Sequence, residues 1–198
     1  MTTHIFLLLD MTGSMFAGKE MTMDACNEFI SGQKSNYGGG DSIFTLGVFN
    51  SNVGLERVAR KVPLEKAPMI DLEHYRPDGG TPLYDAIGEA MDILESDEGQ
   101  VLFIIQTDGQ ENCSQRVTRD QVIQRVAEKT AAGWQFVYLG CDIDAMTEGE
   151  VIGIPSGNTL SYARGNTKQA FNTLGRSARA YRETGSTSSK AFFIREKE

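Results

Sequence analysis

The sequence contains few of the residues that build disulfide frameworks or soft-metal sites. Its 198 residues include only three cysteines, Cys26, Cys113 and Cys141, and two histidines, His4 and His74. The cysteines are odd in number, lie far apart and show no CxxC spacing, which argues against a secreted disulfide scaffold and against a zinc finger. We therefore expect a reduced, intracellular protein.

Acidic residues outnumber basic residues in this sequence, and long apolar runs are missing. The chain has 19 Lys and Arg against 27 Asp and Glu, a net charge of −8, so a nucleic-acid backbone would be repelled. No apolar run approaches the roughly 18 residues of a membrane span. No basic segment followed by an apolar segment precedes the first predicted strand, so no secretion signal is expected. These features predict a cytoplasmic protein with neither a nucleic-acid nor a membrane partner.

Short apolar runs alternate with amphipathic helical patterns along the chain. Runs of this kind are typical of strands buried on both faces, and the weaker, charged run at 53–62 suits an antiparallel edge strand. The predicted strands span 4–9, 43–49, 53–62, 101–106, 134–140 and 158–162. The predicted helices span 17–33, 82–94 with Thr81 as N-cap, 118–132, 144–150, and one from 166 onward.

This alternation predicts one α/β domain. We expect a three-layer, doubly wound, mostly parallel sheet with one antiparallel edge strand and helices on both faces. The domain is expected over residues 1–183, and residues 184–198 are expected to form a loose tail.

Oxygen-bearing side chains follow two of the predicted strands and precede one predicted helix. Asp10, Thr12 and Ser14 come after the first strand, Asp108 follows the strand at 101–106, and Thr81 stands before a helix. In doubly wound sheets, ligands bind beyond the carboxyl ends of the strands. Carboxylates and hydroxyls without histidine or thiolate form a ligand set for a hard cation such as Mg²⁺.

Three segments resemble the metal-ion-dependent adhesion site of von Willebrand factor type A (VWA) domains, which have a Rossmann-like fold. They are DMTGS at 10–14, GGTPLYDAI at 79–87 and TDG at 107–109, and the resemblance covers roughly residues 3–182. The stretch from LGCDIDA (139–145) to the helix ending ARAYR is similar to small stand-alone members from bacteria and their viruses.

The resemblance implies a role for each matching residue. Thr12 and Ser14 would bind the ion through their hydroxyls, Thr81 would supply a ligand from the third segment, and Asp10 and Asp108 would hold the ion directly or through water. Asp85, one helical turn after Thr81, would support these ligands without binding the ion itself. The family more often has serine where Thr12 stands, and the extra methyl group restricts the rotamers of this hydroxyl.

The same resemblance implies a non-enzymatic adaptor. An Asp or Glu of a partner protein would complete the coordination of Mg²⁺, with Mn²⁺ or Ca²⁺ as other suitable ions. Two alternatives stay open: a Mg²⁺-dependent phosphoester hydrolase, and a constitutive subunit of a larger assembly such as a partner of a ring ATPase. A catalytic role would require a general base or nucleophile near the metal, and none stands at a predicted strand end.

Several features also have simpler interpretations. DMTGS could be a cluster of helix-capping residues, and the GGG run at 38–40 is best interpreted as a flexible connector. Asp142 and Asp144 could add negative potential to the site, although we favour capping of the next helix. His74 could line the rim of the site or be a solvated loop histidine. The apolar patch Phe192–Ile194 could be a docking peptide or could fold back onto the domain.

Overall fold

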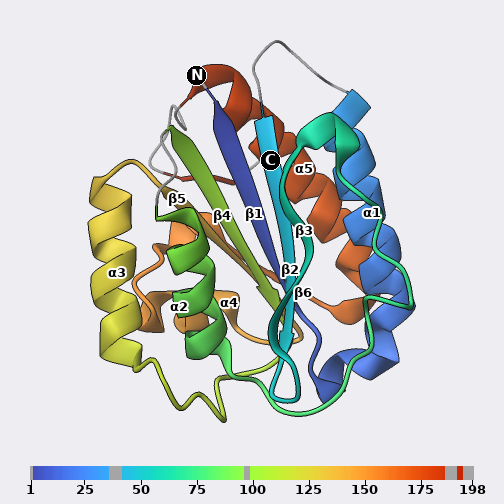
Figure 1. Ribbon diagram of the computed structural model, residues 1–198, viewed down its shortest axis with the longest axis vertical. Coiled ribbons are helices and arrows are strands. Elements are labelled where there is room, and N and C mark those ends of the chain that lie inside the picture. The colour runs from blue at the N-terminus through green and yellow to red at the C-terminus, as the bar shows by residue number, and fades with distance from the viewer. Residues whose placement is uncertain (1, 36–41, 96–98, 186–190, 194–198) are drawn as a thin grey trace.

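The computed structural model describes residues 2–35, 42–95, 99–185 and 191–193 (Figure 1). In chain order, its strands are β1 (Thr3–Asp10), β2 (Ser42–Asn50), β3 (Gly54–Pro63), β4 (Gln100–Thr107), β5 (Gln135–Cys141) and β6 (Thr159–Tyr162). Its helices are α1 (Lys19–Ser35), α2 (Leu83–Leu94), α3 (Arg119–Ala131), α4 (Ala145–Val151) and α5 (Thr167–Thr184). Its short 3-10 helices are η1 (Gly13–Gly18), η2 (Leu64–Lys66), η3 (Ser156–Asn158) and η4 (Arg164–Asn166).

The strands form one sheet in the order β3-β2-β1-β4-β5-β6. All neighbours pair in parallel except β2 and β3, which pair antiparallel at the edge of the sheet. The predicted mostly parallel sheet with one antiparallel edge strand is confirmed. The chain builds outward from β1 in one direction through β2 and in the other through β4, so the strand order reverses between β1 and β4.

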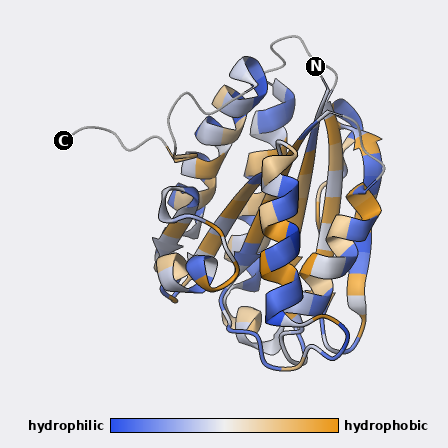
Figure 2. Ribbon diagram, turned by 90° about the vertical axis from the view of Figure 1, so that its left-hand side faces the viewer, coloured by the Kyte–Doolittle hydropathy of each residue, from blue (hydrophilic) through white to orange (hydrophobic). Residues whose placement is uncertain are grey.

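The sheet is covered on both faces because its central strands are apolar on both. In β1, Ile5, Leu7 and Leu9 belong to the core under α1 and α5, whereas Phe6 and Leu8 belong to the core under α2, α3 and α4. Figure 2 shows the hydrophobic strands lying between helices with hydrophilic outer faces. Each fully buried Leu or Phe contributes about 1.5–3 kcal/mol relative to an exposed one, so the two cores fix the strand ends that carry the site.

The two helix starts nearest the proposed site differ from the sequence prediction. The predicted helix 17–33 is preceded by η1, so a tight 3-10 segment follows β1 before α1 begins at Lys19. The prediction that Thr81 caps the next helix was wrong, because α2 begins at Leu83 with Pro82 at the N-cap. The Thr81 N–H donates to Asn112 Oδ1 at 2.8 Å, and the N-cap position of α2 has no side-chain capping hydrogen bond.

Part of the expected loose tail lies against the domain. Phe192 is 1% exposed, and its N–H donates to Asn158 Oδ1 at 3.0 Å. Its ring centroid lies 6.4 Å from that of Tyr181 on α5. Phe193 is also buried, at 7% exposed, so for Phe192 and Phe193 folding back is the correct alternative and the docking peptide is not. The domain boundary at 183 stays a prediction, and Ile194 and the GGG run at 38–40 lie outside the described residues.

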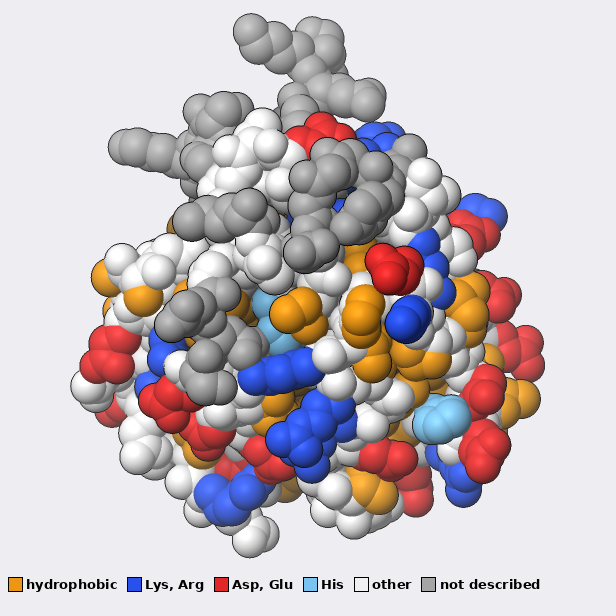
Figure 3. All heavy atoms as spheres, turned by 45° about the horizontal axis from the view of Figure 1, so that its top comes forward, with side chains coloured by type: hydrophobic (Ala, Val, Ile, Leu, Met, Phe, Trp, Pro, Cys, Tyr) orange, Lys and Arg blue, Asp and Glu red, His pale blue; other side chains and the backbone are white. Residues whose placement is uncertain are grey.

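The face of the molecule that Figure 3 shows is mixed in charge, with acidic and basic side chains interspersed over it. Within the described ranges, no helix combines the length and the apolar character that a membrane crossing requires.

Candidate metal site

The predicted ligands lie at the carboxyl edge of the sheet, where the strand order reverses. Asp10 is the last residue of β1, and Thr107 is the last residue of the neighbouring strand β4, directly before Asp108. Parallel pairing of β1 with β4, with Leu9 opposite Gln106, brings the two acidic residues to adjacent strand ends. The fold therefore places them where doubly wound sheets bind ligands.

Backbone hydrogen bonds tie the three predicted ligand loops together. The Gly13 N–H donates to Gly79 O at 3.0 Å, and the Asn112 N–H donates to Thr81 O at 3.1 Å. Gly79 has a φ of +69°, and a Cβ there would lie 2.6 Å from Ser51 Oγ, so only glycine fits this turn without strain. The loop before α2 is thus hydrogen-bonded both to the loop after β1 and to the loop after β4.

Asp10 is buried and accepts hydrogen bonds at both of its carboxylate oxygens. Its Oδ1 accepts from the Thr12 N–H at 2.7 Å, and its Oδ2 accepts from the Thr107 hydroxyl at 2.5 Å. The Tyr75 hydroxyl donates to the Asp10 carbonyl oxygen at 2.6 Å. Burial raises the pKa of Asp10 to about 6, although the donors from Thr107 and Thr12 partly offset it. A nearby cation would favour the charged carboxylate.

The hydroxyls of Thr12 and Ser14 lie together, and that of Ser14 contacts the Asp108 carboxylate. The Thr12 and Ser14 oxygens lie 3.2 Å apart, and Ser14 Oγ donates to Asp108 Oδ1 at 2.5 Å. Thr12 stands at the N-cap of η1, but its side chain makes no capping hydrogen bond. The helix-capping interpretation of DMTGS therefore does not account for these side chains.

Thr81 brings a third hydroxyl to the same place. A Cβ built on Gly109 would lie 3.2 Å from Thr81 Oγ1 and 3.8 Å from Ser14 Oγ, so both hydroxyls flank Gly109. Thr81 is itself buried, with 3% of its surface exposed. The structure thus brings together all five predicted ligands, namely Asp10, Thr12, Ser14, Thr81 and Asp108; that they bind a metal ion stays a prediction.

Asp85 is held by the loop that follows Asp108. Its carboxylate accepts the backbone N–H groups of Gln115, Arg116 and Val117 at 2.9, 2.9 and 2.7 Å. These residues continue the loop that carries Asp108. The structure therefore places Asp85 as an anchor of that loop, and its predicted supporting role at the metal site stays a prediction.

Sequence reasoning missed a basic residue at the site. Arg164, in η4, donates from Nη2 to Asp108 Oδ2 at 2.8 Å. Of the two acids after β5, Asp144 caps α4 through the Met146 N–H at 3.1 Å, as favoured, but Asp142 pairs with Arg164 instead. Nothing in the local sequence around Arg164 predicted its position, because it lies 56 residues from Asp108 along the chain.

Three further residues around the site were not assigned a role: Thr107, Tyr75 and Asn112. Thr107 stands beside Asp108 at the end of an apolar strand, so its position could have been recognised from the sequence. Tyr75 and Asn112 lie in long loops whose course the sequence does not determine.

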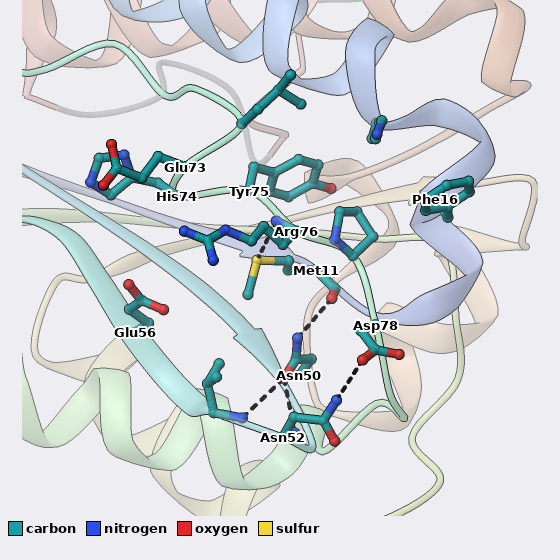
Figure 4. A pocket seen from close by; sticks show the side chains of 14 residues that line it. Met11, Phe16, Asn50, Asn52, Glu56, Glu73, His74, Tyr75, Arg76 and Asp78 are labelled. Carbon is teal, nitrogen blue, oxygen red and sulfur yellow. Dashed lines mark hydrogen bonds between the residues drawn. The ribbon is translucent and has the colours of Figure 1, made fainter.

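A cavity of about 660 Å³ lies beside the site (Figure 4). It is lined in part by Met11, Asn50 and Asp78, and Figure 4 shows the Asn50 amide donating to the Met11 carbonyl, at 3.1 Å. Phe16 of η1, 63% exposed, lies on its border. His74 also lines the cavity, and its Nδ1 lies 2.7 Å from Asp71 Oδ1.

The donor set fits a hard divalent cation. It consists of two carboxylates, from Asp10 and Asp108, and hydroxyl oxygens, which suit Mg²⁺, Mn²⁺ or Ca²⁺ better than soft metals. Within the described part of the chain, no three His, Cys, Asp or Glu side chains gather into a metal-binding cluster. An ion here would therefore depend on the hydroxyls of Thr12, Ser14 and Thr81, and on water, to complete its shell.

Comparison with solved structures identifies the fold. Neither models of known protein families nor curated protein sequences match the chain. The vWF domain of the type V pili tip protein Mfa5 from Porphyromonas gingivalis superposes with a TM-score of 0.70 at 8% identity, over 94% of this chain and 98% of that one.

Proximal thread matrix protein 1 from the mussel byssus gives a TM-score of 0.67 at 14% identity, over 90% of this chain. A form of that protein with a zinc-occupied metal-ion-dependent adhesion site gives 0.58 at 13% identity, over 86% of this chain. This chain spans about half of the mussel protein, 46% in both comparisons. The fold of this chain is that of the von Willebrand factor type A domain.

Proposed function

We propose that this chain is a protein-binding module that holds a divalent ion at the carboxyl edge of its sheet. The supporting observation is that three loops bring Asp10, Thr12, Ser14, Thr81 and Asp108 together at one point of the sheet edge. The zinc-occupied site of the mussel matrix protein, which has a similar fold, shows that the fold can hold a metal ion.

The ion proposed here is Mg²⁺. Oxygen ligands with hydroxyls and water are the environment that Mg²⁺ prefers, and Mn²⁺ and Ca²⁺ accept similar donors. The ion would neutralise the buried carboxylates of Asp10 and Asp108 and would leave a coordination position open toward solvent. A carboxylate from an Asp or Glu of a partner protein would fill that position. Similar folds in a pilus tip protein and a pilus adhesin support a role in protein interaction.

The partner segment would also contact the surface beside the ion. Phe16 follows Ser14 by two residues and is exposed, and the cavity with Leu72 and His74 adjoins it. Exposed aromatic side chains next to a polar anchor are frequent sources of binding energy. An acidic residue flanked by an apolar one is the partner chemistry that suits this surface.

A binding role is favoured over catalysis because neither histidine is placed as a base for a metal-bound water. His4 lies at the opposite end of β1, where its Nε2 is 2.8 Å from Thr45 Oγ1. His74 pairs with Asp71. The positions of these two histidines therefore support a non-enzymatic module, which we propose acts in the cytoplasm.

Calorimetry with Mg²⁺ tests the site. Wild type is expected to bind one ion, and Thr81→Ala is expected to bind it at least about tenfold more weakly, since positioned metal-site residues contribute on this scale. Thr130→Ala, which removes an exposed threonine hydroxyl from α3, is the matched control and should bind as wild type does. Absence of binding to Mg²⁺, Mn²⁺ and Ca²⁺ alike would refute the proposed metal site.

A second experiment tests the binding role. Partners captured by wild type in Mg²⁺ buffer should be lost with EDTA and with Asp10→Ala. Equal capture by wild type and Asp10→Ala would contradict the proposal. Turnover of a generic phosphoester with Mg²⁺, abolished by Asp108→Ala, would instead establish the hydrolase. An oligomer that dissociates in EDTA would establish the assembly subunit.

A further inference from the structure

The buried carboxylate of Asp108 already has a cationic partner within the chain. Arg164 Nη2 lies 2.8 Å from Asp108 Oδ2, and the Asp108 side chain is 0% exposed whereas that of Arg164 is 24% exposed. The other oxygen, Oδ1, accepts from the Ser14 hydroxyl at 2.5 Å. Both oxygens of this proposed metal ligand are therefore engaged, one of them by a permanent positive charge.

The surrounding structure holds the guanidinium in place. Asp142 accepts from the Arg164 backbone N–H at 2.9 Å and from Nε at 3.2 Å. Asp142 does so with a φ of 56°, a left-handed conformation that non-glycine residues rarely adopt. Arg164 Nη1 lies 3.4 Å from Ser14 O, and a Cβ at Gly18 would lie 2.8 Å from that nitrogen. Glycine at 18 thus makes room for Arg164 beside the ligand loop.

A divalent ion at Asp108 would meet this charge directly. A buried carboxylate is costly without a cation, which Arg164 supplies here. A second, doubly charged cation bound to the same carboxylate would be repelled by the guanidinium over a few ångströms, where charges interact strongly near a protein surface. For the ion to bind, Arg164 must therefore move away from Asp108, or the ion must bind against this repulsion.

We propose that Arg164 competes with the divalent ion for Asp108 and thereby sets the metal affinity of the free protein. This inference rests on the proposed function, because it presupposes that the ion binds at Asp108. Arg164 acts through Asp108 and is an affinity-determining residue rather than a metal ligand. Without its charge, the two carboxylates of Asp10 and Asp108 present a more negative site to the ion.

Calorimetric Mg²⁺ titration of wild type, Arg164→Gln and Arg164→Lys tests the competition. Arg164→Gln should bind Mg²⁺ about tenfold more tightly than wild type, or more, because the repulsion is removed. Arg164→Lys keeps the charge but loses the forked geometry, so its affinity should stay closer to wild type. Arg125→Gln is the matched control: Arg125 is 25% exposed and pairs with Asp92, and its variant should bind Mg²⁺ as wild type does.

Thermal unfolding gives a second readout that does not depend on calorimetry. In EDTA, Arg164→Gln should unfold at a lower temperature than wild type, because Asp108 is left without a cation. Added Mg²⁺ should raise the unfolding temperature of Arg164→Gln by more than it raises that of wild type.

The outcomes separate this inference from the proposed function. Equal or weaker Mg²⁺ binding by Arg164→Gln, with clear binding by wild type, would overturn the competition and leave the metal site standing. Binding by the variant alone would support the competition strongly. No binding by any variant would overturn both.

Discussion

Asn112 and Thr81 are joined by two hydrogen bonds that run in opposite directions. The Thr81 N–H donates to the Asn112 side-chain oxygen at 2.8 Å, and the Asn112 N–H donates to the Thr81 carbonyl oxygen at 3.1 Å. This pair links the loop after β4, which carries Asp108, to the segment before α2, which carries Thr81. The position of the third proposed hydroxyl ligand thus depends on a residue outside the proposed ligand set.

Replacing Asn112 should therefore weaken metal binding without removing a ligand. Asn112→Ala eliminates the acceptor for the Thr81 N–H and is expected to lower Mg²⁺ affinity by about tenfold, the scale of a residue that orients a ligand. Asn172→Ala, at an exposed position of α5, is the control and should leave the affinity unchanged. Mg²⁺ titration calorimetry makes the comparison, and equal affinities of the two variants would show that Thr81 is held by other contacts.

Asp85 should matter for folding stability. Burial alone would raise its pKa, but the backbone donors of Gln115, Val117 and Arg116 outweigh burial, so the pKa lies below its ordinary value. Asp85→Asn places an amide N–H₂ among these donors and should lower the free energy of unfolding by about 2–3 kcal/mol at pH 7. Urea denaturation measures the difference.

Asp92→Asn is the charge-matched control for Asp85→Asn. It breaks an ion pair with Arg125 whose Asp92 side chain is 64% exposed, and exposed pairs contribute about 0–1 kcal/mol. If the two variants were equally stable, the loop at 115–117 would not depend on Asp85.

The fold and the proposed ligands were accessible to sequence reasoning for the same physical reason. Strands buried on both faces appear as continuous apolar runs, and the first polar residue after such a run marks the sheet edge. That logic located Asp10 at the end of β1 and Asp108 directly after β4. It required no knowledge of the loops between them.

The rest of the site depends on loop geometry and on contacts between distant segments, which sequence periodicity does not determine. Arg164 can reach Asp108 because β6 pairs in parallel with β5, so that η4, which follows β6, lies at the same edge of the sheet as Asp108. Thr81 was predicted as a helix cap because threonine before proline commonly caps, whereas its N–H is satisfied by Asn112. The resemblance gave Asp85 a supporting role, but the sequence could not indicate which backbone N–H groups its carboxylate accepts from, because they lie on another loop.

The C-terminal aromatic pair should contribute to stability as core residues do. Phe192 is 1% exposed and packs near Tyr181, so Phe192→Ala should cost about 3–5 kcal/mol. Phe16→Ala, at a side chain 63% exposed, is the control of the same residue type and should change stability by about 0.5 kcal/mol or less. Thermal denaturation distinguishes them, and a Phe192→Ala variant as stable as wild type would mean that the segment contributes no packing energy.

The raised pKa of Asp10 predicts an unusual pH dependence of the metal-free protein. The folded-state pKa is about 6 and the ordinary value is 3.8, so the folded state binds the Asp10 proton more tightly than the unfolded state does. The resulting stabilisation is fully present below pH 4 and is lost as the pH rises through 6. A shift of this size corresponds to about 3 kcal/mol.

Asp10→Asn isolates this contribution, because the amide has nearly the shape of the carboxylate and does not titrate. In EDTA, urea denaturation between pH 4 and pH 7 should show wild type losing stability relative to Asp10→Asn as the pH rises. At pH 7, saturating Mg²⁺ should restore stability to wild type, because the ion binds the folded state alone, and should have little effect on Asp10→Asn. Parallel pH profiles for the two proteins would mean that the Asp10 carboxylate is better solvated than its buried position implies.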